Sequence, residues 1–583
     1  MSLTVTHRFV SSKTDSTDTT LVNPSNWNAT HAVDVELGYV LSTDCDFTQQ
    51  APVENLSAAL RSVTLTPVPF GINGINTNHY LGIFDNSGVF LEAVLINGGG
   101  AVSEDTTGTL TFASIAGSYA TGTYKIGSCT AGIQEAIWGS ADKSVFIPGG
   151  NHLTYKTITI PTTLSPEIWG GGSAQTLIYP QFTDGDIFSY ISPVTKNFHF
   201  HDLGIVQLNT ATAGYAIALR GMYSGILENI SSYAGYNGLL IEGGNGCFTR
   251  NLHFIGYSNI GAFIHATTVI GGRHQGWTFS GGASSQGNLL IQADAGGATA
   301  GMQFSDISLQ LGLIGIQIYA NGGVCNELSF ANLTVDSNTT TGIRLLGTAG
   351  GNGIHFTNLR GSMIGAPLFD LYGAYSDVSI IGGSGSANGN SNGIVLRGAQ
   401  NFTMEGFNMA GGGTGDVNDV ALYITVDPNT AAPCNNVRIS NCSFGFYGTG
   451  APNACRFGMG IDSFNHRVRI ANCDFSGITA PILDGSLIPT IYTGYVKGLT
   501  DIPSTIGFSA NLSFPRMPQG GVVTVTGSGT VTAVSGLYAG QYGSIKSSGS
   551  LTFAVGPSIG TGIVTNPDTL ISFWFDGTTI WLG

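Results

Sequence analysis

The sequence predicts an all-β fold, a solenoid of short parallel strands, because one short pattern recurs between residues 198 and 475. Apolar and variable positions alternate on either side of a central Asn, Asp or Gly. These centres mostly lie about 22 to 35 residues apart, which is typical of stacked repeats. Each copy is expected to form one turn of the solenoid. The centres are Asp202, Asn229, Asn251, Asp306, Asn332, Asn358, Gly406, Asn441 and Asn472.

A second recurring phrase lies between these copies. It begins with a Gly or another small residue and continues as a short apolar strand, as in residues 214–219, 238–241, 261–264 and 315–318. Repeats of this length hold about two or three short strands joined by Gly, Asn or Ser turns, and leave no room for a crossover helix. The two phrases together favour a coil of parallel strands whose apolar side chains stack inward.

The rest of the chain divides into shorter segments around this solenoid, which is expected over residues 121–490. Residues 1–38 are polar and rich in Thr, Ser and Asn, so they cannot bury a core of their own. Residues 39–120 alternate in the β manner around a turn at residues 85–88, which predicts a small antiparallel adaptor domain. Residues 491–583 carry short β runs between Gly and Ser turns and stay apolar up to the last residue.

One short helix is expected before the first turns of the coil. The period changes at Thr130, which can cap a helix whose apolar residues are Ile133, Ala136 and Ile137. An open end of a solenoid exposes unpaired strand edges, and an amphipathic helix laid across it would cover them. We therefore expect this helix to cap the coil.

Composition excludes several classes of function. Only 9% of the 583 residues are charged and the formal net charge is −15, so the Lys and Arg clusters that hold phosphates are missing and no nucleic-acid partner is expected. No run of about 18 apolar residues occurs, and the start lacks a basic region followed by an apolar one, so neither membrane insertion nor a signal peptide is expected.

The eight cysteines show no CxxC spacing, so no metal site, disulfide scaffold or cofactor is expected. Cys442 and Cys473 fall at equivalent inward positions of successive turns. They can bridge or serve as small core residues, and we expect the second role.

The residues that follow the helix have a counterpart in known proteins. They read FIPGG at 146–150, TITIP at 157–161, IWGGG at 168–172 and TLIY at 176–179. Together with the repeats, this succession resembles the pectate-lyase-like right-handed parallel β-helices of bacteriophage tailspikes and polysaccharide-degrading enzymes. The resemblance covers residues 121–489 and implies the fold, but no single activity.

The two ends of the chain resemble parts of the same class of protein. Residues 21–31 (LVNPSNWNATH) resemble the N-termini of bacteriophage tail fibres and tailspikes, where this part is held by the virion. Residues 574–583 resemble the C-terminal β modules of phage tail proteins, in which three chains commonly clamp together. The resemblance therefore implies attachment to phage tail or baseplate proteins through residues 1–38, and a homotrimer joined by a C-terminal β trimerisation module at 491–583.

Outward side chains of neighbouring turns lie about 5 Å apart, so columns of them along the coil can build a site. A carboxylate between a cation and an imidazole can act as a tuned general acid or base. The alternative is a solvated surface ladder of matched charges, which contributes little. One column, before the central Asn or Asp, contains His201, Glu228 and Arg250, and the other, after the second strand, contains Arg220, Glu242, His265, Gln292 and Tyr319.

Two kinds of chemistry remain open for these columns. Glycoside hydrolysis with inversion needs two carboxyl groups about 6.5 to 9.5 Å apart. Glu242 and Asp294 belong to turns two apart, which predicts about 9.6 Å from twice the strand spacing, and Glu228 is a further candidate. A lyase would instead use His265 or Tyr319 as the base and Arg220 to neutralise a uronate.

Aromatic residues near the turns of the early repeats are candidates for substrate binding, together with Arg220. Flat amphipathic rings suit sugar faces, although such rings can also pack beneath loops. The repeated Asn residues are interpreted as structural, because stacked amides satisfy turn backbone groups and one another. The candidate rings are Tyr236, Tyr257, Trp277 and Tyr319.

The sequence therefore predicts a bacteriophage tailspike that is made in the host cytoplasm and carried on the virion. It is expected to bind host capsule or lipopolysaccharide and to depolymerise it during adsorption, either by hydrolysis or by elimination. A receptor-binding or structural tail fibre without activity stays open as the alternative, because carboxylates are few.

Overall fold

The computed structural model divides the chain into two compact units, residues 1–148 with 164–171, and residues 149–163 with 172–583. The described residues are 2–5, 31–34, 39–42, 50–65, 79–99, 107–140, 144–160, 167–191, 198–364, 367–388, 392–410, 420–445, 457–464, 466–475, 480–484, 490–493, 504–514, 521–537 and 541–583.

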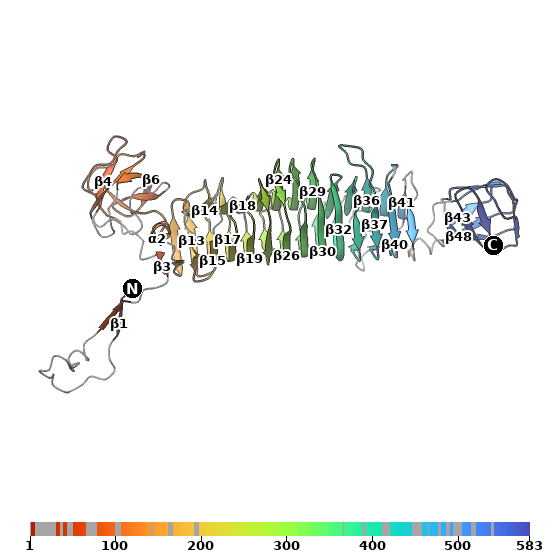
Figure 1. Cartoon of the computed structure of the whole chain (residues 1–583), viewed down its shortest axis with the longest axis horizontal. Coiled ribbons are helices and arrows are strands. Elements are labelled where there is room, and N and C mark those ends of the chain that lie inside the picture. The colour runs from red at the N-terminus through yellow and green to blue at the C-terminus, as the bar shows by residue number, and fades with distance from the viewer. Residues whose placement is uncertain are drawn as a thin grey trace, which may run out of the picture. The chain divides into compact units, whose positions relative to one another are not determined.

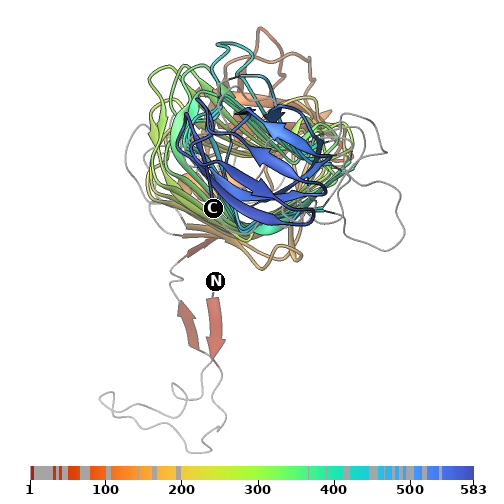
Figure 2. The ribbon, with the colours of Figure 1, turned by 90° about the vertical axis from the view of Figure 1, so that its right-hand side faces the viewer.

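Two long parallel sheets form the solenoid of the second unit. Figure 1 shows their strands side by side along the coil, and Figure 2 shows the turns one behind another. In the second unit the first sheet contains β10 (Gly150–Thr154), β13 (Thr176–Pro180), β15 (Phe198–Val206), β17 (Gly225–Tyr233), β19 (Cys247–Ile255), β22 (Gly272–Gln275), β23 (Thr278–Ser280), β26 (Met302–Gln310), β28 (Leu328–Asp336), β30 (Gly351–Ile364), β32 (Tyr375–Asn388), β34 (Thr403–Glu405), β35 (Asn408–Ala410), β37 (Val437–Ser440), β38 (Ser443–Gly445), β40 (Val468–Ala471) and β42 (Ile491–Thr493).

In the part of the chain that the structure describes, the second sheet contains 13 strands, and neighbouring strands of successive turns pair in parallel. The all-β parallel solenoid predicted from the repeats is therefore confirmed. The strands are β11 (Ile158–Ile160), β14 (Phe188–Ile191), β16 (Tyr215–Arg220), β18 (Asn237–Glu242), β20 (Ile260–Ala266), β24 (Gly287–Asp294), β27 (Ile314–Asn321), β29 (Thr341–Gly347), β31 (Phe369–Tyr372), β33 (Ile394–Arg397), β36 (Val420–Thr425), β39 (Phe457–Ile461) and β41 (Ala480–Asp484).

The central Asn or Asp of each repeat bends the first sheet. Asn229, for example, has φ of 52° and Asn332 has φ of 54°, in the left-handed region that Asn and Asp tolerate better than other side chains. Since the bend recurs once per turn, it keeps the strands before and after it in register with the turns on either side. The repeated Asn or Asp is thus a structural requirement of the coil.

The side chains at these bends bind one another along the coil. The amide of Asn229 donates to Asp202, and the amide of Asn251 donates to Asn229, each over 2.9 Å. Farther along, Asn332 and Asn358 continue the ladder in the same way, again over 2.9 Å. The structural interpretation of these polar residues is confirmed, and they are not available as catalytic groups.

The small residue that opens the second phrase is explained by close contact between turns. A Cβ added to Gly238 would lie 2.2 Å from the carbonyl oxygen of Gly261, and one added to Gly261 would lie 2.5 Å from that of Asn288. A side chain at either position would push neighbouring turns apart. Glycine is therefore required at the start of β18 and in β20.

Apolar residues stack inside the coil as identical side chains of successive turns. The rings of Phe304 and Phe330 are stacked with centroids 4.6 Å apart, and Phe356 continues the stack at 4.9 Å. All three are buried. Burial of such side chains stabilises the fold by about 1.5 to 3 kcal/mol each.

The first unit contains a five-stranded antiparallel sheet with its own apolar core. Residues 21–30, which belong to the stretch that resembles phage N-termini, lie outside the described residues. The elements of the sheet are β4 (Ser62–Leu65), β5 (Tyr80–Asp85), β6 (Phe90–Gly99), β7 (Gly108–Phe112) and β8 (Tyr124–Ser128), and the unit also holds the antiparallel pair β1 (Ser2–Val5) and β2 (His31–Asp34) and the parallel strands β3 (Tyr39–Leu41), β9 (Ser144–Ile147) and β12 (Glu167–Gly170).

The expected helix is present as α2 (Ile133–Gly139) in the first unit, but its N-cap differs from the prediction. Gly132 occupies the cap position with φ of 73°, and Thr130 lies two residues earlier, where its hydroxyl accepts a hydrogen bond from the backbone N–H of Gln134 over 3.2 Å. The left-handed backbone at Gly132 explains the shift, because glycine adopts it at little cost. Among the described residues, no helix is long and apolar enough to cross a membrane.

The C-terminal residues form a β module with a separate apolar core. Ile580 and Leu582 are buried in that core, so these apolar side chains at the end of the chain pack within their own module. The main sheet contains β43 (Ser504–Gly507), β45 (Gly521–Thr526), β48 (Tyr542–Ser547), β51 (Leu570–Phe575) and β52 (Ile580–Leu582), and the smaller strands are β44 (Asn511–Ser513), β46 (Gly529–Val531), β47 (Ala533–Ser535), β49 (Leu551–Phe553) and β50 (Ile563–Thr565).

The stacked core predicts that two phenylalanines of the first sheet contribute very different amounts to the free energy of unfolding. Phe330→Ala is expected to lower the free energy of unfolding by about 3 to 5 kcal/mol, because it leaves a cavity between two stacked rings. Phe248→Ala removes a ring that is 45% exposed, and should cost less than about 1 kcal/mol. Urea unfolding of both variants beside the wild type measures the difference, and equal losses would contradict the inward stack.

Candidate functional site

A row of polar side chains runs along the outer face of the second sheet. Arg220 pairs in register with Glu242, and Glu242 with His265, on β16, β18 and β20. Gln292 on β24 and Tyr319 on β27 occupy the next two positions. The column predicted from the repeats is therefore confirmed, because each member occupies the same position in its own turn.

His265 lies between two carboxylates. Its Nδ1 is 3.2 Å from Oε1 of Glu242, and its Nε2 is 2.6 Å from Oδ2 of Asp294. Asp294 is two residues beyond Gln292 on β24, on the same side of the strand, so it reaches the imidazole of the neighbouring turn. The ring of Phe263 stacks on that of His265 with centroids 4.9 Å apart and supports its orientation.

Arg220 belongs to the same network, in which it pairs with carboxylates. Its guanidinium donates to Oδ2 of Asp186 over 2.8 Å and lies 3.4 Å from Oε2 of Glu242. Asp186 also accepts the backbone N–H of Tyr215 over 3.0 Å, which fixes its carboxylate beside β16. The positive charge of Arg220 is thus balanced by two carboxylates.

The hydrogen bonds of this row constrain which of its groups carry protons. Both imidazole nitrogens of His265 face a carboxylate, so holding both bonds needs either an imidazolium or a protonated carboxyl group. Hydrogen bonds from His265, then from Asn321 and Gln292, lower the pKa of Asp294 to about 2. Asp294 is therefore the ionised member at neutral pH, and a hydrogen bond between Nδ1 of His265 and Glu242 requires one further proton on that pair.

Tyrosines lie at both ends of the row, with Tyr215 and Tyr236 near Arg220 and Tyr319 at the opposite end. Burial, and next the charge of Asp186, raise the pKa of Tyr215 to about 12, while Arg220 lowers it. Tyr236 and Tyr319 are half-buried, with part of each ring facing outward. These two remain candidates for contact with a ligand.

The geometry limits the two chemistries left open by the sequence. The ring of His265 occupies the space between Glu242 and Asp294 that an inverting pair gives to water and sugar. The pair therefore cannot flank a glycosidic bond in this arrangement. Arg220, already paired with two carboxylates, is poorly suited to neutralise a uronate.

Two of the aromatic candidates are wrong. Trp277 is buried, and its indole N–H donates to the hydroxyl of Thr249 over 2.8 Å. Tyr257 is buried as well, and its hydroxyl donates to Asn288. Alternation near a turn does not reveal which side faces inward, so the sequence left open whether these rings meet a ligand or pack inside, and the structure shows that they are buried.

A second surface lies on the first sheet. Two rows of outward side chains cross its strands in register. At one end they consist of large side chains, Glu228, Arg250 and Phe248, and at the other end of small ones such as Ser305 and Ser329. The step in size leaves a hollow of about 430 Å³, and a neighbouring one of about 300 Å³ shares Gln303 and Ser329 with it. We call this surface the first-sheet groove.

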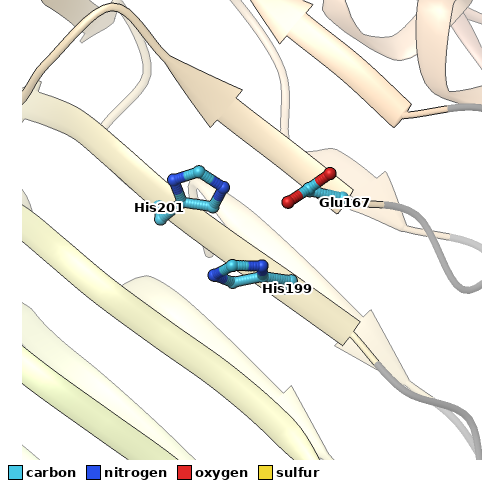
Figure 3. A group of neighbouring side chains, drawn as sticks. All are labelled: Glu167, His199 and His201. Carbon is cyan, nitrogen blue, oxygen red and sulfur yellow. The ribbon is translucent and has the colours of Figure 1, made fainter. Parts of the chain in front are cut away.

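The predicted neighbours His201, Glu228 and Arg250 do follow one another in register. Arg250 donates to Glu228 over 2.9 Å, so the carboxylate that lines the larger hollow is paired with a guanidinium group. His201 lies 2.7 Å from Asp202, and Figure 3 shows its ring beside that of His199 on β15, with centroids 4.1 Å apart. Figure 3 also labels Glu167, which belongs to β12 of the first unit.

Cys442 and Cys473 are free and buried, as are the other cysteines that the structure describes. A hydrogen bond to Cys473 and then burial raise the pKa of the Cys442 thiol. A thiol with a raised pKa is a poor nucleophile at neutral pH. The prediction that both are small core residues is confirmed.

Asp186, Asn321 and the groove residues Arg273, Gln275 and Gln303 are not among the site residues predicted from the sequence. Asp186 precedes β14 and contacts Arg220 from 34 residues away, outside either repeated phrase. Asn321 ends β27 and binds Asp294 from 27 residues away. A search for carboxylates and amides one turn on either side of each charged outward residue would have found both.

The lowered pKa of Asp294 predicts a pH dependence of stability. Its folded pKa of about 2 lies below the value near 3.9 of an unfolded chain, so the carboxylate stabilises the fold above about pH 4 and loses this effect as the pH falls towards 2. The side chain is one third exposed, which limits the effect to less than about 1 kcal/mol. Urea midpoints of wild type and Asp294→Asn between pH 5 and pH 2 should converge with acid, and parallel curves would contradict this.

Comparison with known proteins finds likeness in solved structures only. No family model and no curated protein matches the chain. The catalytic domain of a GH87 α-1,3-glucanase in complex with tetrasaccharides shows 13% identity and a TM-score of 0.32, over 77% of this chain and 95% of that one.

Two further solved structures show a comparable likeness. The catalytic unit of a thermostable GH87 α-1,3-glucanase from Streptomyces thermodiastaticus shows 11% identity and a TM-score of 0.32, over 76% of this chain and 89% of that one. The mannuronan C-5 epimerase A-module from Azotobacter vinelandii shows 12% identity and a TM-score of 0.40, over 63% of this chain and 96% of that one. At these values the likeness extends to neither activity nor substrate, and the strand pairing by itself makes this chain a parallel β-solenoid.

Proposed function

We propose that this chain is a bacteriophage tailspike that binds a polysaccharide of the host surface and depolymerises it. The observation that carries the proposal is His265 held between Glu242 and Asp294 on an outer face of the coil. Charged residues make up only 9% of the chain, yet this row joins three carboxylates, an arginine and an imidazole. Clusters of this kind are found at catalytic sites more often than chance predicts.

In this proposal Glu242 is the general acid of a hydrolase. Ionised Asp294 accepts the proton on Nε2 of His265, so a hydrogen bond between Nδ1 and Glu242 over 3.2 Å needs a second proton on one of these two groups. Glu242 is 32% exposed and can give its proton to the leaving oxygen as the glycosidic bond breaks. Water then bonds to the anomeric carbon, and the proton that this water loses returns through His265 to Glu242, so that the acid is restored. Asp294 acts through His265 and is a positioning residue. Hydrolysis is favoured over elimination because Arg220 already has two carboxylate partners.

The substrate fits the surface of the coil. A long stack of turns with few charges presents a wide polar face to an extended, repetitive ligand. Tyr236 and Tyr319, half-buried near the row, supply rings for sugar faces. A formal net charge of −15 favours neutral sugars over strongly acidic ones.

The biological setting is proposed from the resemblance of the sequence to phage tail proteins. Three chains would form the spike, residues 1–38 would attach it to the tail or baseplate, and host capsule or lipopolysaccharide would be the receptor. The protein would be made in the host cytoplasm and carried on the virion.

A second candidate is a tail fibre that binds glycan without cleaving it. The first-sheet groove favours it, because its larger hollow combines polar side chains with the rings of Phe248 and Phe304, and its acid Glu228 is paired with Arg250. A ligand held there would meet no free carboxylate from that hollow. The two candidates differ in one measurable property, the release of products.

Substitution of Glu242 tests the proposed acid. Glu242→Gln should lower the release of reducing ends from capsule or lipopolysaccharide by about 10²- to 10⁴-fold, while glycan binding is retained, because only the proton donor is lost. Glu405→Gln, an exposed acid of the first sheet, is the matched control and should leave turnover unchanged. Unchanged turnover in Glu242→Gln removes Glu242 from the chemistry. Wild-type protein that binds glycan and releases no product supports the second candidate instead.

Substitution of His265 tests the relay. His265→Asn should lower turnover and flatten its pH profile, because Glu242 loses the group that returns its proton. His253→Asn changes an exposed imidazole on the first sheet and serves as control. Absorbance of unsaturated products should stay at background in all variants, and its appearance would show elimination.

A further inference from the structure

We propose that the C-terminal module carries a glycan-binding platform built from Tyr542, Trp574 and Trp581. This goes beyond the proposed function, since it involves none of the residues of the solenoid and requires no cleavage. The three rings are 52%, 49% and 45% exposed, although their module has a well-filled core. Exposed apolar residues that lie side by side, unlike single ones, often mark a binding surface.

The three rings form a continuous row. Tyr542 of β48 pairs in register with Trp574 of β51, and Trp574 pairs with Trp581 of β52. Directly opposite residues on neighbouring strands have Cβ atoms about 4.5 to 5.5 Å apart. This spacing is comparable to the length of one sugar in an extended chain, so a glycan that crosses the strands would place successive sugars over successive rings.

The row lies on the face of the sheet that points away from the core. Phe573 and Phe575, which alternate with Trp574 on β51, are buried in the core, and so is Leu582 next to Trp581. The inward positions therefore already supply the packing that the module needs. The outward rings contribute little to that core.

One ring is held in place before any ligand arrives. The indole N–H of Trp581 donates to Oδ2 of Asp576 over 3.0 Å, while Oδ1 of Asp576 accepts the backbone N–H groups of Thr578 and Thr579 over 2.8 and 2.7 Å. The tight turn thus fixes the carboxylate, and the carboxylate fixes the indole. A ring with a fixed orientation loses little conformational entropy on binding.

The chemistry beside the rings suits a sugar. Ser544 and Ser572 occupy the next outward positions and pair with each other across β48 and β51, and Lys546 follows on the same face. Hydroxyl groups next to aromatic faces match a pyranose ring, which offers C–H groups on its faces and hydroxyls at its edge. The positive charge of Lys546 has Asp568 at 3.7 Å, so Lys546 does not make the face basic.

The area is too small for a stable contact with another copy of the chain. Three half-exposed rings of about 150 to 250 Å² each present on the order of 300 Å² together. A standard protein interface takes about 800 Å² from each partner. A short run of neutral sugars, in contrast, can be covered by three rings and the adjacent hydroxyls.

The test uses the full chain and four probes, neutral hexasaccharides of glucose, galactose, mannose and N-acetylglucosamine, titrated by calorimetry. At least one should bind the wild type, and Trp574→Ala should weaken it about tenfold or more. Trp574→Tyr keeps a ring and should retain most of the affinity. Trp581→Phe loses the bond to Asp576 and part of the ring surface, and should weaken binding a few-fold. Leu570→Ala, exposed on the same face, is the control and should bind as the wild type does.

Several results would overturn the platform. It fails if none of the four probes binds, or if Trp574→Ala binds the best probe as tightly as the wild type does, since the sugar then sits elsewhere. It also fails if Trp574→Ala lowers the mass of the assembly in sedimentation while sugar binding persists, because the surface is then a contact between copies. Product release from polysaccharide, measured separately with Glu242→Gln, reports on the solenoid and is unaffected by these outcomes.

Discussion

The bend at the centre of each repeat is the constraint on which the rest of the coil depends. A left-handed residue recurs once per turn, and where consecutive turns carry Asn or Asp there, these side chains bind one another. Because side chains in a strand alternate between two faces, a slip of one residue would turn every core residue outward. The Asn ladder penalises such a slip at each turn, since an amide out of line would lose its partner.

The row on the second sheet is a consequence of that registry. Arg220, Glu242 and His265 are far apart in sequence, and they meet because each occupies the same position in its own turn. The same regularity explains why Asp294 reaches His265, since two residues along a strand returns a side chain to the same face. In a chain with so few charges, the ionic groups interact mostly with one another, and each is balanced by its immediate neighbours.

The repeats allowed the solenoid and the order of its outward columns to be predicted, because period and alternation are local properties of the sequence. Trp277 and Tyr257 could not be placed, since each lies beside a turn where alternation restarts and the inward side is set by packing. The contact of Asp186 with Arg220 could not be predicted either, because it starts in a loop outside the repeats. The position of the His265 ring between two acids depends on side-chain conformation, and no sequence pattern encodes that. The capping residue of α2 was misplaced because Gly132 offers a left-handed backbone that a search for Thr and Ser ignores.

Each turn of this coil contacts chiefly the turn before it and the turn after it, and this has an evolutionary consequence. Recombination that duplicates or deletes a whole repeat would leave the remaining turns able to close on one another, provided that the left-handed Asn or Asp is carried along. Such an event would also change which side chains become neighbours on the outer face. Loss of the turn that contains β20, for example, would bring Glu242 beside Gln292 and remove the imidazole between the acids. A lineage could thus gain or lose surface chemistry in single steps while its scaffold persists.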